Sequence, residues 1–276
     1  KFTFSSNDDI SIKHHRDAKA SEESAKRNFA YLIAEYKRDG EKTDPRTLAY
    51  LGRTLMGFGD FNKAIYFMEK HIEKSGWDED RYLSWCLMAD IYTRQDKFTQ
   101  ATACAFEALQ ECPEFPEAYY QLHDIYFQQS KWEKSLEWGL MGLSKPIPKT
   151  NIPIDPSSYT WRPMLSMAEC YFQLGRLDKA KLLFDKAEKY VPTLDYVVKT
   201  KPIYEEAVER KNYIDNLIEM LVSVEKDKPA IANLIKSIPE KYKNHELVAK
   251  IINKFSEPKK WDDKSIVIFC GHTWEK

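Results

Sequence analysis

A short residue pattern recurs four times in this chain, and it is the feature that most constrains the fold. Each copy has a first position that is usually small, a large residue three places later, and a second small residue twelve places after the first. The three positions are filled by Gly52, Ala89, His123 and Ala168; by Leu55, Tyr92, Tyr126 and Tyr171; and by Ala64, Ala101, Ser135 and Ala180. The steps from Gly52 to Ala89, from Ala89 to His123 and from His123 to Ala168 are 37, 34 and 45 residues.

This pattern predicts pairs of antiparallel helices. Small residues allow two helix backbones to cross closely, while large residues fill the space between successive pairs. Further small residues follow in the second helices at Ala108, Gly142 and Ala187, and turns at Gly59-Asp60 and Gly175-Arg176 separate the two helices of their pairs. His123 occupies a position that is small in the other copies. We therefore expect either a locally wider helix pair there or a polar contact of the imidazole ring.

The repeat resembles the tetratricopeptide repeat, whose unit is about 34 residues long. The resemblance implies an all-α fold in which antiparallel helix pairs stack into a right-handed superhelix. It would cover residues 21–192 as a half-repeat followed by four full repeats. The half-repeat is predicted to be one helix that ends before Gly40, with Ala30 and Ala34 at small positions.

The rest of the chain departs from the regular pattern. Residues 193–260 are expected to be degenerate repeats or a cap, with helices over 203–210, 212–225, 229–237 and 245–255. Between the third and fourth repeats, residues 145–159 contain Pro146, Pro148, Pro153 and Pro156. Prolines at this density predict a stiff extended loop without a helix. That loop would either lie along the array or reach a neighbouring domain.

Composition excludes several classes of function. The chain has 42 basic and 43 acidic residues, so its net charge of -1 gives no general attraction to nucleic acid or to an anionic membrane. It has no apolar run of about 18 residues that would span a bilayer. The five cysteines show no metal-binding spacing, which predicts reduced, buried thiols and a cytoplasmic protein. No metal ligand set and no phosphate-binding or nucleophile motif is recognisable.

In such an array the expected binding surface is the concave groove lined by the first helix of each pair. The residues predicted to line it are Arg53, Asp90, Arg94, Tyr120, Asp124, Phe127, Glu169 and Phe172. Three carboxylates beside aromatic rings would suit a basic or polar partner. The alternative is that the carboxylates pair with Arg53, Arg94 or Arg162 inside the array. The lysine and asparagine clamp that characterises chaperone-tail binders is absent from the matching positions.

The two ends do not follow the repeat. Residues 1–20 contain two predicted short strands, Phe2–Phe4 and Ile10–Lys13, and residues 261–276 contain the apolar run IVIFCG, which predicts a buried strand. ISIKHHR, the pair Arg27-Asn28 and IVIFCGHTWEK resemble segments that flank tetratricopeptide repeats in multidomain glycosyltransferases. The resemblance implies the tail of a GT-A, family-2-like domain upstream and the first strand of a GT-B domain downstream. It also places His14 or His15 near a metal or a nucleotide diphosphate.

Three hypotheses of function follow. In the first, the chain is a scaffold that positions the catalytic domains of a glycosyltransferase and docks an acceptor or a protein partner. The parent enzyme would then use a divalent metal and a nucleotide sugar, whereas this segment alone would have no cofactor and no activity. In the second, the chain is a stand-alone adaptor that binds peptides in its groove. In the third, it mainly mediates self-association.

Overall fold

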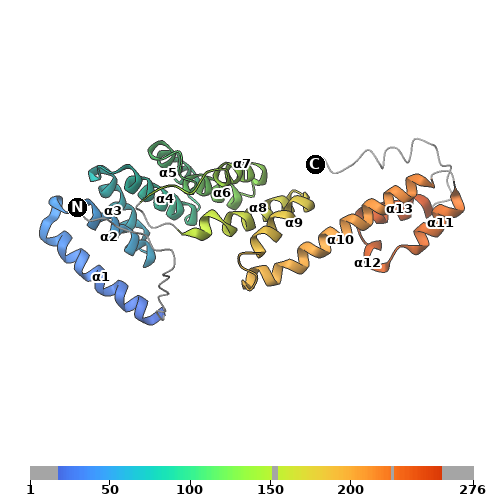
Figure 1. The fold of residues 1–276 in the computed structure, drawn as a ribbon, viewed down its shortest axis with the longest axis horizontal. Coiled ribbons are helices and arrows are strands. Elements are labelled where there is room, and N and C mark those ends of the chain that lie inside the picture. The colour runs from blue at the N-terminus through green and yellow to red at the C-terminus, as the bar shows by residue number, and fades with distance from the viewer. Residues whose placement is uncertain (1–17, 151–154, 225–226, 257–276) are drawn as a thin grey trace. The chain divides into compact units, whose positions relative to one another are not determined.

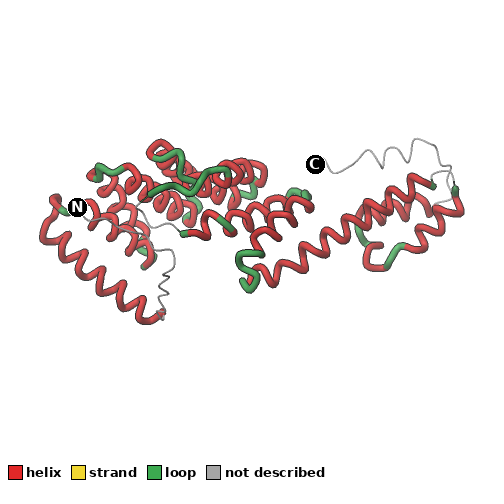
Figure 2. Tube along the Cα trace, in the orientation of Figure 1, coloured by secondary structure: helices red, strands yellow, loops and turns green. Residues whose placement is uncertain are grey.

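The computed structural model describes residues 18–150, 155–224 and 227–256, and these are almost entirely helical (Figure 1). In chain order the elements are α1 (Ala18–Asp39), the 3₁₀ helix η1 (Gly40–Lys42), α2 (Pro45–Gly57), α3 (Phe61–Lys74), α4 (Asp78–Arg94), α5 (Phe98–Glu111), α6 (Glu117–Gln128), α7 (Trp132–Leu143), the 3₁₀ helix η2 (Pro156–Tyr159), α8 (Trp161–Gln173), α9 (Leu177–Glu188), α10 (Asp195–Ser223), α11 (Lys228–Ser237), α12 (Glu240–Lys243) and α13 (Glu246–Ser256). Figure 2 shows these helices joined by loops, and the described ranges contain no strand. The predicted terminal strands, His14 and His15 lie outside the described residues.

The chain divides into two compact units, Lys1–Gln121 and Leu122–Lys276. The first unit holds α1 to α5 and the start of α6, and the second holds the remainder of α6 and the helices after it. Each unit has its own buried clusters among the described residues, such as Tyr82 with Ala108 in the first and Met167 with Phe184 in the second. The domain boundaries expected from the sequence stay predictions.

The all-α prediction is confirmed, and consecutive helices pack together in α2 and α3, α4 and α5, and α8 and α9. We call the first helix of each pair the A helix (α2, α4, α6 and α8) and the second the B helix (α3, α5, α7 and α9). At the second small position of the B helices, the side chains of Ala64, Ala101, Ser135 and Ala180 are all fully buried. In the first pair, a Cβ atom added to Gly52 would lie 2.8 Å from Met68 Cγ. The backbones therefore cross where only a very small residue fits.

The turns between A and B helices share one hydrogen-bonded geometry. A single residue in each turn has a positive φ, at Gly59 (79°), Asp96 (56°), Ser130 (54°) and Gly175 (71°). The residue after it donates its N–H to a carbonyl five residues back, as in Lys97 to Tyr92 at 2.9 Å. This is the Schellman arrangement, which satisfies carbonyls at the end of the A helix. Glycine adopts it without strain, whereas aspartate and serine do not.

Helix α1 corrects one sequence-based prediction. Ala30 and Ala34 were expected at close-packed small positions, but both are exposed. α1 packs on α2 through a different face, on which Phe29 meets Phe58 at a ring distance of 5.6 Å. Tyr36 similarly meets Phe67 at 4.9 Å. Aromatic contacts, and not small residues, therefore mark the face that α1 buries.

Helix α10 corrects another prediction, because the helices expected over 203–210 and 212–225 are one continuous helix. Its first half places Val197 and Tyr204 in the core of the fourth repeat, and its second half places Ile214 in a separate core with α11 to α13. Pro202 lies inside this helix. Proline removes one backbone hydrogen bond, but burial of both halves against different cores favours a helix that continues through it. The predicted helices over 229–237 and 245–255 correspond to α11 and α13.

The proline-rich loop also differs from its prediction. Residues 145–150 contain no helix, as expected, but Pro156–Tyr159 forms the short 3₁₀ helix η2. Asp155 caps it by accepting a hydrogen bond from the N–H of Ser157 at 3.0 Å. Proline is tolerated at the first position of a helical turn because its missing N–H would have no partner there.

The positive φ of Ser130 leads to a stability prediction. Ser130→Gly should raise the free energy of unfolding by about 0.5–1 kcal/mol, because glycine adopts the left-handed conformation without a Cβ clash. Ser144→Gly is a matched control, since Ser144 follows α7 with a helical φ of -78° and donates its hydroxyl to Met141 O at 2.7 Å. That control should lower stability. Thermal and urea unfolding of both variants would test this, and stabilisation by both substitutions would contradict the strain at Ser130.

Candidate functional site

The predicted groove residues of the first unit lie on A helices but differ in how fully they are paired. Asp90 is paired within α4, where Arg94 donates to its two carboxylate oxygens at 3.0 and 2.7 Å. Arg53 on α2 makes a longer contact, from Nη2 to Asp80 Oδ1 at 3.5 Å. Tyr120 is partly buried, which raises its pKa to about 12. Asp90 thus follows the predicted alternative of pairing inside the array.

In the second unit the predicted residues are Asp124, Phe127, Glu169 and Phe172. Asp124 is exposed, with 55% of its side chain accessible, and its Oδ1 lies 3.9 Å from His123 Nε2. Phe127 and Phe172 are half-buried. Phe127 packs edge to face with Trp132, and Phe172 packs at a tilt against Tyr204. The second unit therefore presents acidic groups beside partly covered aromatic rings.

Glu169 is held by residues that the sequence did not single out. Gln173 Nε2 donates to Glu169 Oε1 at 2.7 Å, and the Tyr204 hydroxyl donates to Glu169 Oε2 at 3.3 Å. Tyr204 comes from α10, and burial with the nearby Glu169 charge raises its pKa. A tyrosine buried in the first half of α10 gave no sequence signal of this role, because the repeat pattern is lost after residue 192. Glu169 is thus oriented but half-buried.

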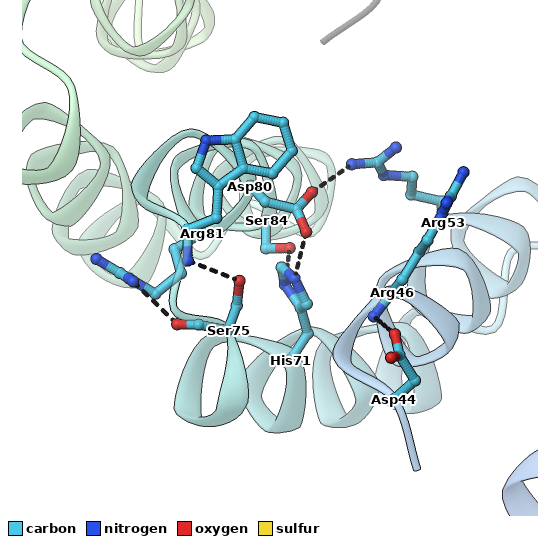
Figure 3. A network of polar contacts seen from close by, with 9 residues as sticks. Asp44, Arg46, Arg53, His71, Ser75, Asp80, Arg81 and Ser84 are labelled. Carbon is cyan, nitrogen blue, oxygen red and sulfur yellow. Dashed lines mark hydrogen bonds and ion pairs between the residues drawn. The ribbon is translucent and has the colours of Figure 1, made fainter. Parts of the chain in front are cut away.

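A polar network joins three helices of the first unit around His71 (Figure 3). His71 on α3 is fully buried, and its Nδ1 lies 2.8 Å from Ser84 Oγ on α4. Its Nε2 lies 2.8 Å from Asp80 Oδ2, and the other oxygen of Asp80 faces Arg53 on α2. His71 takes the third small position, which is Ala108, Gly142 or Ala187 in the other repeats. His71 was not predicted as a polar contact from the sequence, although a histidine at a position that is small in the other repeats was the available signal.

The order serine, histidine, aspartate invites comparison with a hydrolytic triad, but the burial argues for a structural role. A nucleophilic serine has to reach a substrate and an oxyanion-stabilising group. Ser84 is only 1% exposed and His71 is 0% exposed. The network instead hydrogen-bonds polar groups that the packing of α3 on α4 would otherwise strand.

His123 forms a second buried network at a first small position. Its Nδ1 lies 2.8 Å from the carbonyl oxygen of Ser135 on α7, and its Nε2 lies 2.8 Å from Ser166 Oγ on α8. Space for the ring comes from Gly139, where an added Cβ would lie 2.9 Å from both His123 Nδ1 and Met167 Sδ. The expected polar contact is therefore present. Burial lowers the pKa of His123, and a neutral ring can donate from Nδ1 and accept at Nε2.

Comparison with known proteins agrees with this geometry. Residues 162–192 match the family model of the tetratricopeptide repeat. The matched segment begins at the second residue of α8 and contains all of α9, so it covers the fourth helix pair. Residues 162–192 therefore form one tetratricopeptide repeat. A search of curated proteins found no match.

Solved structures show similarity at low sequence identity. TTC0263, a thermophilic TPR protein in Thermus thermophilus, is 17% identical, and the match covers 68% of this chain and 92% of that one with a TM-score of 0.50. A crystal structure of MamA is 20% identical, with 64% and 95% covered and a TM-score of 0.48. MamA residues 41 to the end from Desulfovibrio magneticus RS-1 is 16% identical, with 63% and 90% covered and a TM-score of 0.49. The likeness to TTC0263 supports the fold alone.

The described residues include cysteines and other side chains of the kinds that can react as thiols or bind a metal ion. The described cysteines, Cys86, Cys104, Cys112 and Cys170, are all buried free thiols, and burial is the main cause that raises the pKa of each. Within the same ranges no group of three or more His, Cys, Asp or Glu side chains could hold a metal ion. None of the helices described has the length and apolarity needed to cross a bilayer.

A double-mutant cycle at His123 and Gly139 tests the size compensation between α6 and α7. His123→Ala should cost about 2–4 kcal/mol through a cavity and unpaired serine groups. Gly139→Ala should cost about 1–3 kcal/mol because its Cβ would overlap His123 and Met167. The loss of unfolding free energy in the double variant should be about 1–2 kcal/mol smaller than the sum of the losses in the two single variants, since alanine at 123 makes room for the new Cβ.

Gly57→Ala is the control for helix propensity in this cycle. A Cβ at Gly57 would meet no atom within 4 Å, so the substitution should be neutral or stabilising. Urea unfolding at constant pH measures the four corners of the cycle. Strict additivity of the two single effects would show that His123 and Gly139 do not share space.

The buried neutral His123 also predicts a pH dependence. Its folded pKa lies below the unfolded value of about 6.5, so the unfolded chain binds the proton more readily. The contribution of His123 to the free energy of unfolding is therefore fully present above about pH 6.5. It decreases as the pH falls, by at most about 1.4 kcal/mol per pH unit. His123→Asn, which does not titrate, should show a smaller loss between about pH 7 and pH 5. Equal losses in both proteins would contradict the prediction.

Proposed function

We propose that this chain is a protein-binding scaffold whose tetratricopeptide-type helix pairs hold side chains of the A helices toward a partner segment. The observation that supports this proposal most is the difference in burial between the small residues of the B helices and the predicted groove residues of the A helices. The B-helix small residues are fully buried, whereas Asp124, Phe127 and Phe172 keep accessible surface. Stacking of the pairs into a right-handed superhelix is part of this proposal.

The second unit favours a basic segment as the partner. Asp124 is exposed, Glu169 is oriented by Gln173 and Tyr204, and Tyr196 is 45% exposed. Burial is the main cause that raises the pKa of Tyr196, and the charge of Glu169 is the second cause. The two groups are therefore close enough to interact. Lysine or arginine side chains of a partner can form charge-assisted hydrogen bonds with such carboxylates and pack against the rings.

Charge reversal tests the proposed face. Asp124→Lys with Glu169→Lys should weaken binding of a captured protein partner by about tenfold or more, since each reversed charge would repel a basic segment. Glu133→Lys with Glu137→Lys is the matched control, because both are exposed glutamates on the B helix α7 and the change in net charge is the same. Calorimetric titration of purified variants gives the comparison. Equal weakening by the two pairs would place the binding surface elsewhere.

A second, narrower proposal is that the scaffold lies between the catalytic domains of a glycosyltransferase. What favours it is the resemblance of ISIKHHR, Arg27-Asn28 and IVIFCGHTWEK to the flanks of the repeats in such enzymes. The parent enzyme would then bind the divalent metal and the nucleotide sugar, with His14 or His15 near them. Determination of the coding sequence on both sides of this segment tests the proposal. Flanking sequence that encodes no transferase domain would rule it out.

A further inference from the structure

Two arginines and a tyrosine of α2 form an exposed cluster in the first unit. Arg46 and Arg53 stand four residues before and three residues after Tyr50, so all three share one helix face. The guanidinium carbons lie 5.6 and 5.9 Å from the centre of the Tyr50 ring. Tyr50 is 42% exposed and the Arg53 side chain is 33% exposed. A ligand in solvent can therefore reach the cluster.

The hydrogen-bonding capacity of Arg53 is mostly unused. Its Nε is shielded from solvent and has no hydrogen-bond partner among the described residues. Its Nη2 contacts Asp80 Oδ1 at 3.5 Å, the upper limit for a hydrogen bond. The second oxygen of Asp80 is held at 2.8 Å by His71, which is itself fixed by Ser84 (Figure 3). Asp80 thus orients the guanidinium group without satisfying it.

Arg46 adds a second cation to the same surface. Its side chain is exposed, and the backbone N–H of Arg46 donates to Asp44 Oδ1 at 2.8 Å, so Asp44 serves as the cap of α2. The Arg46 guanidinium lies beside the Tyr50 ring, which limits the conformations of the side chain. The cluster therefore combines two planar donor groups with one partly exposed aromatic ring.

We propose that Arg46, Tyr50 and Arg53 form a binding site for the carboxylate of a glutamate or aspartate in an acidic protein segment. This inference goes beyond the basic-segment site proposed for the second unit, and it rests on the proposed function because it assumes that the A helices bind a protein segment. Two guanidinium groups offer paired N–H donors that match the two oxygens of a carboxylate. Asp80 and Asp44 lie nearby, so a singly charged carboxylate meets less repulsion here than a doubly charged phosphate group.

Binding of a defined peptide tests this site. The probe is a fluorescein-labelled oligoglutamate peptide, with oligoglutamine of the same length as the uncharged reference and a phosphoserine peptide as the competing chemistry. Fluorescence anisotropy at low salt gives the dissociation constants for the full chain. The wild type should bind oligoglutamate about tenfold or more tightly than oligoglutamine.

Two pairs of substitutions locate the binding. Arg46→Ala with Arg53→Ala should abolish the preference for oligoglutamate. Lys131→Ala with Lys134→Ala is the matched control: these lysines also lie over one tyrosine ring, Tyr126, at 5.9 and 5.8 Å, and the change in net charge is the same. The control pair should bind as the wild type does. Circular dichroism of each variant verifies that it is folded.

A charge-conserving pair separates hydrogen bonding from net charge. Arg46→Lys with Arg53→Lys keeps both charges but removes the paired donors, and it should weaken oligoglutamate binding about threefold to tenfold. Undiminished binding by this pair, equal losses in the two alanine pairs, or tighter binding of the phosphoserine peptide would each overturn the carboxylate site.

The captured partner distinguishes failure of this inference from failure of the proposed function. If Asp124→Lys with Glu169→Lys weakens partner binding while the Arg46 and Arg53 variants do not, the scaffold proposal is supported and the carboxylate site is contradicted. If both pairs weaken it selectively, both are supported. If neither pair does, both proposals fail.

Discussion

The close crossing of helix backbones at small residues is the constraint on which the remainder of the repeat structure depends. At Gly52 an added Cβ would come within 3.3 Å of the carbonyl oxygen of Ala64, and backbone cannot move aside as a side chain can. Close crossing lets a pair of short helices bury its small residues completely, as the fully buried Ala64 and Ala101 show. Isolated helices of this length are marginal in water, so this packing accounts for their stability.

Two histidines show how the constraint can be satisfied when a large ring fills a position that is usually small. His71 and His123 each bring an aromatic ring and two polar nitrogens into a position that is small in other repeats. Both rings are accommodated because serine hydroxyls bond them, at Ser84 for His71 and at Ser166 for His123. Burial of an imidazole without such bonds would be costly. Each histidine consequently fixes which residue of the next helix it can face, since the partner serine has to stand at one position on that helix.

Much of the fold could be predicted from the sequence, because close packing leaves a periodic signal. The helix pairs, the turns at Gly59 and Gly175 and the burial of Ala64 and Ala180 all follow from residue size and spacing. The continuity of α10 could not be predicted, because local sequence favours a break and only the two separate cores support one long helix. Likewise, the hydrogen bond from Tyr204 to Glu169 joins residues whose proximity depends on how α10 packs on the fourth repeat.

The candidate site was less predictable than the fold, because repeat position determines where a side chain lies but not how it is paired. Arg53, Asp90 and Glu169 occupy the same position in three repeats. Asp90 is satisfied by Arg94 on its own helix and Glu169 by two neighbours, whereas Arg53 keeps an unpartnered buried N–H among the described residues. A buried donor without an acceptor costs free energy, so Arg53 is held less favourably than the carboxylates at the same repeat position. Unsatisfied hydrogen-bonding capacity in the first repeat therefore distinguishes Arg53 from Asp90 and Glu169, whose carboxylates accept short hydrogen bonds.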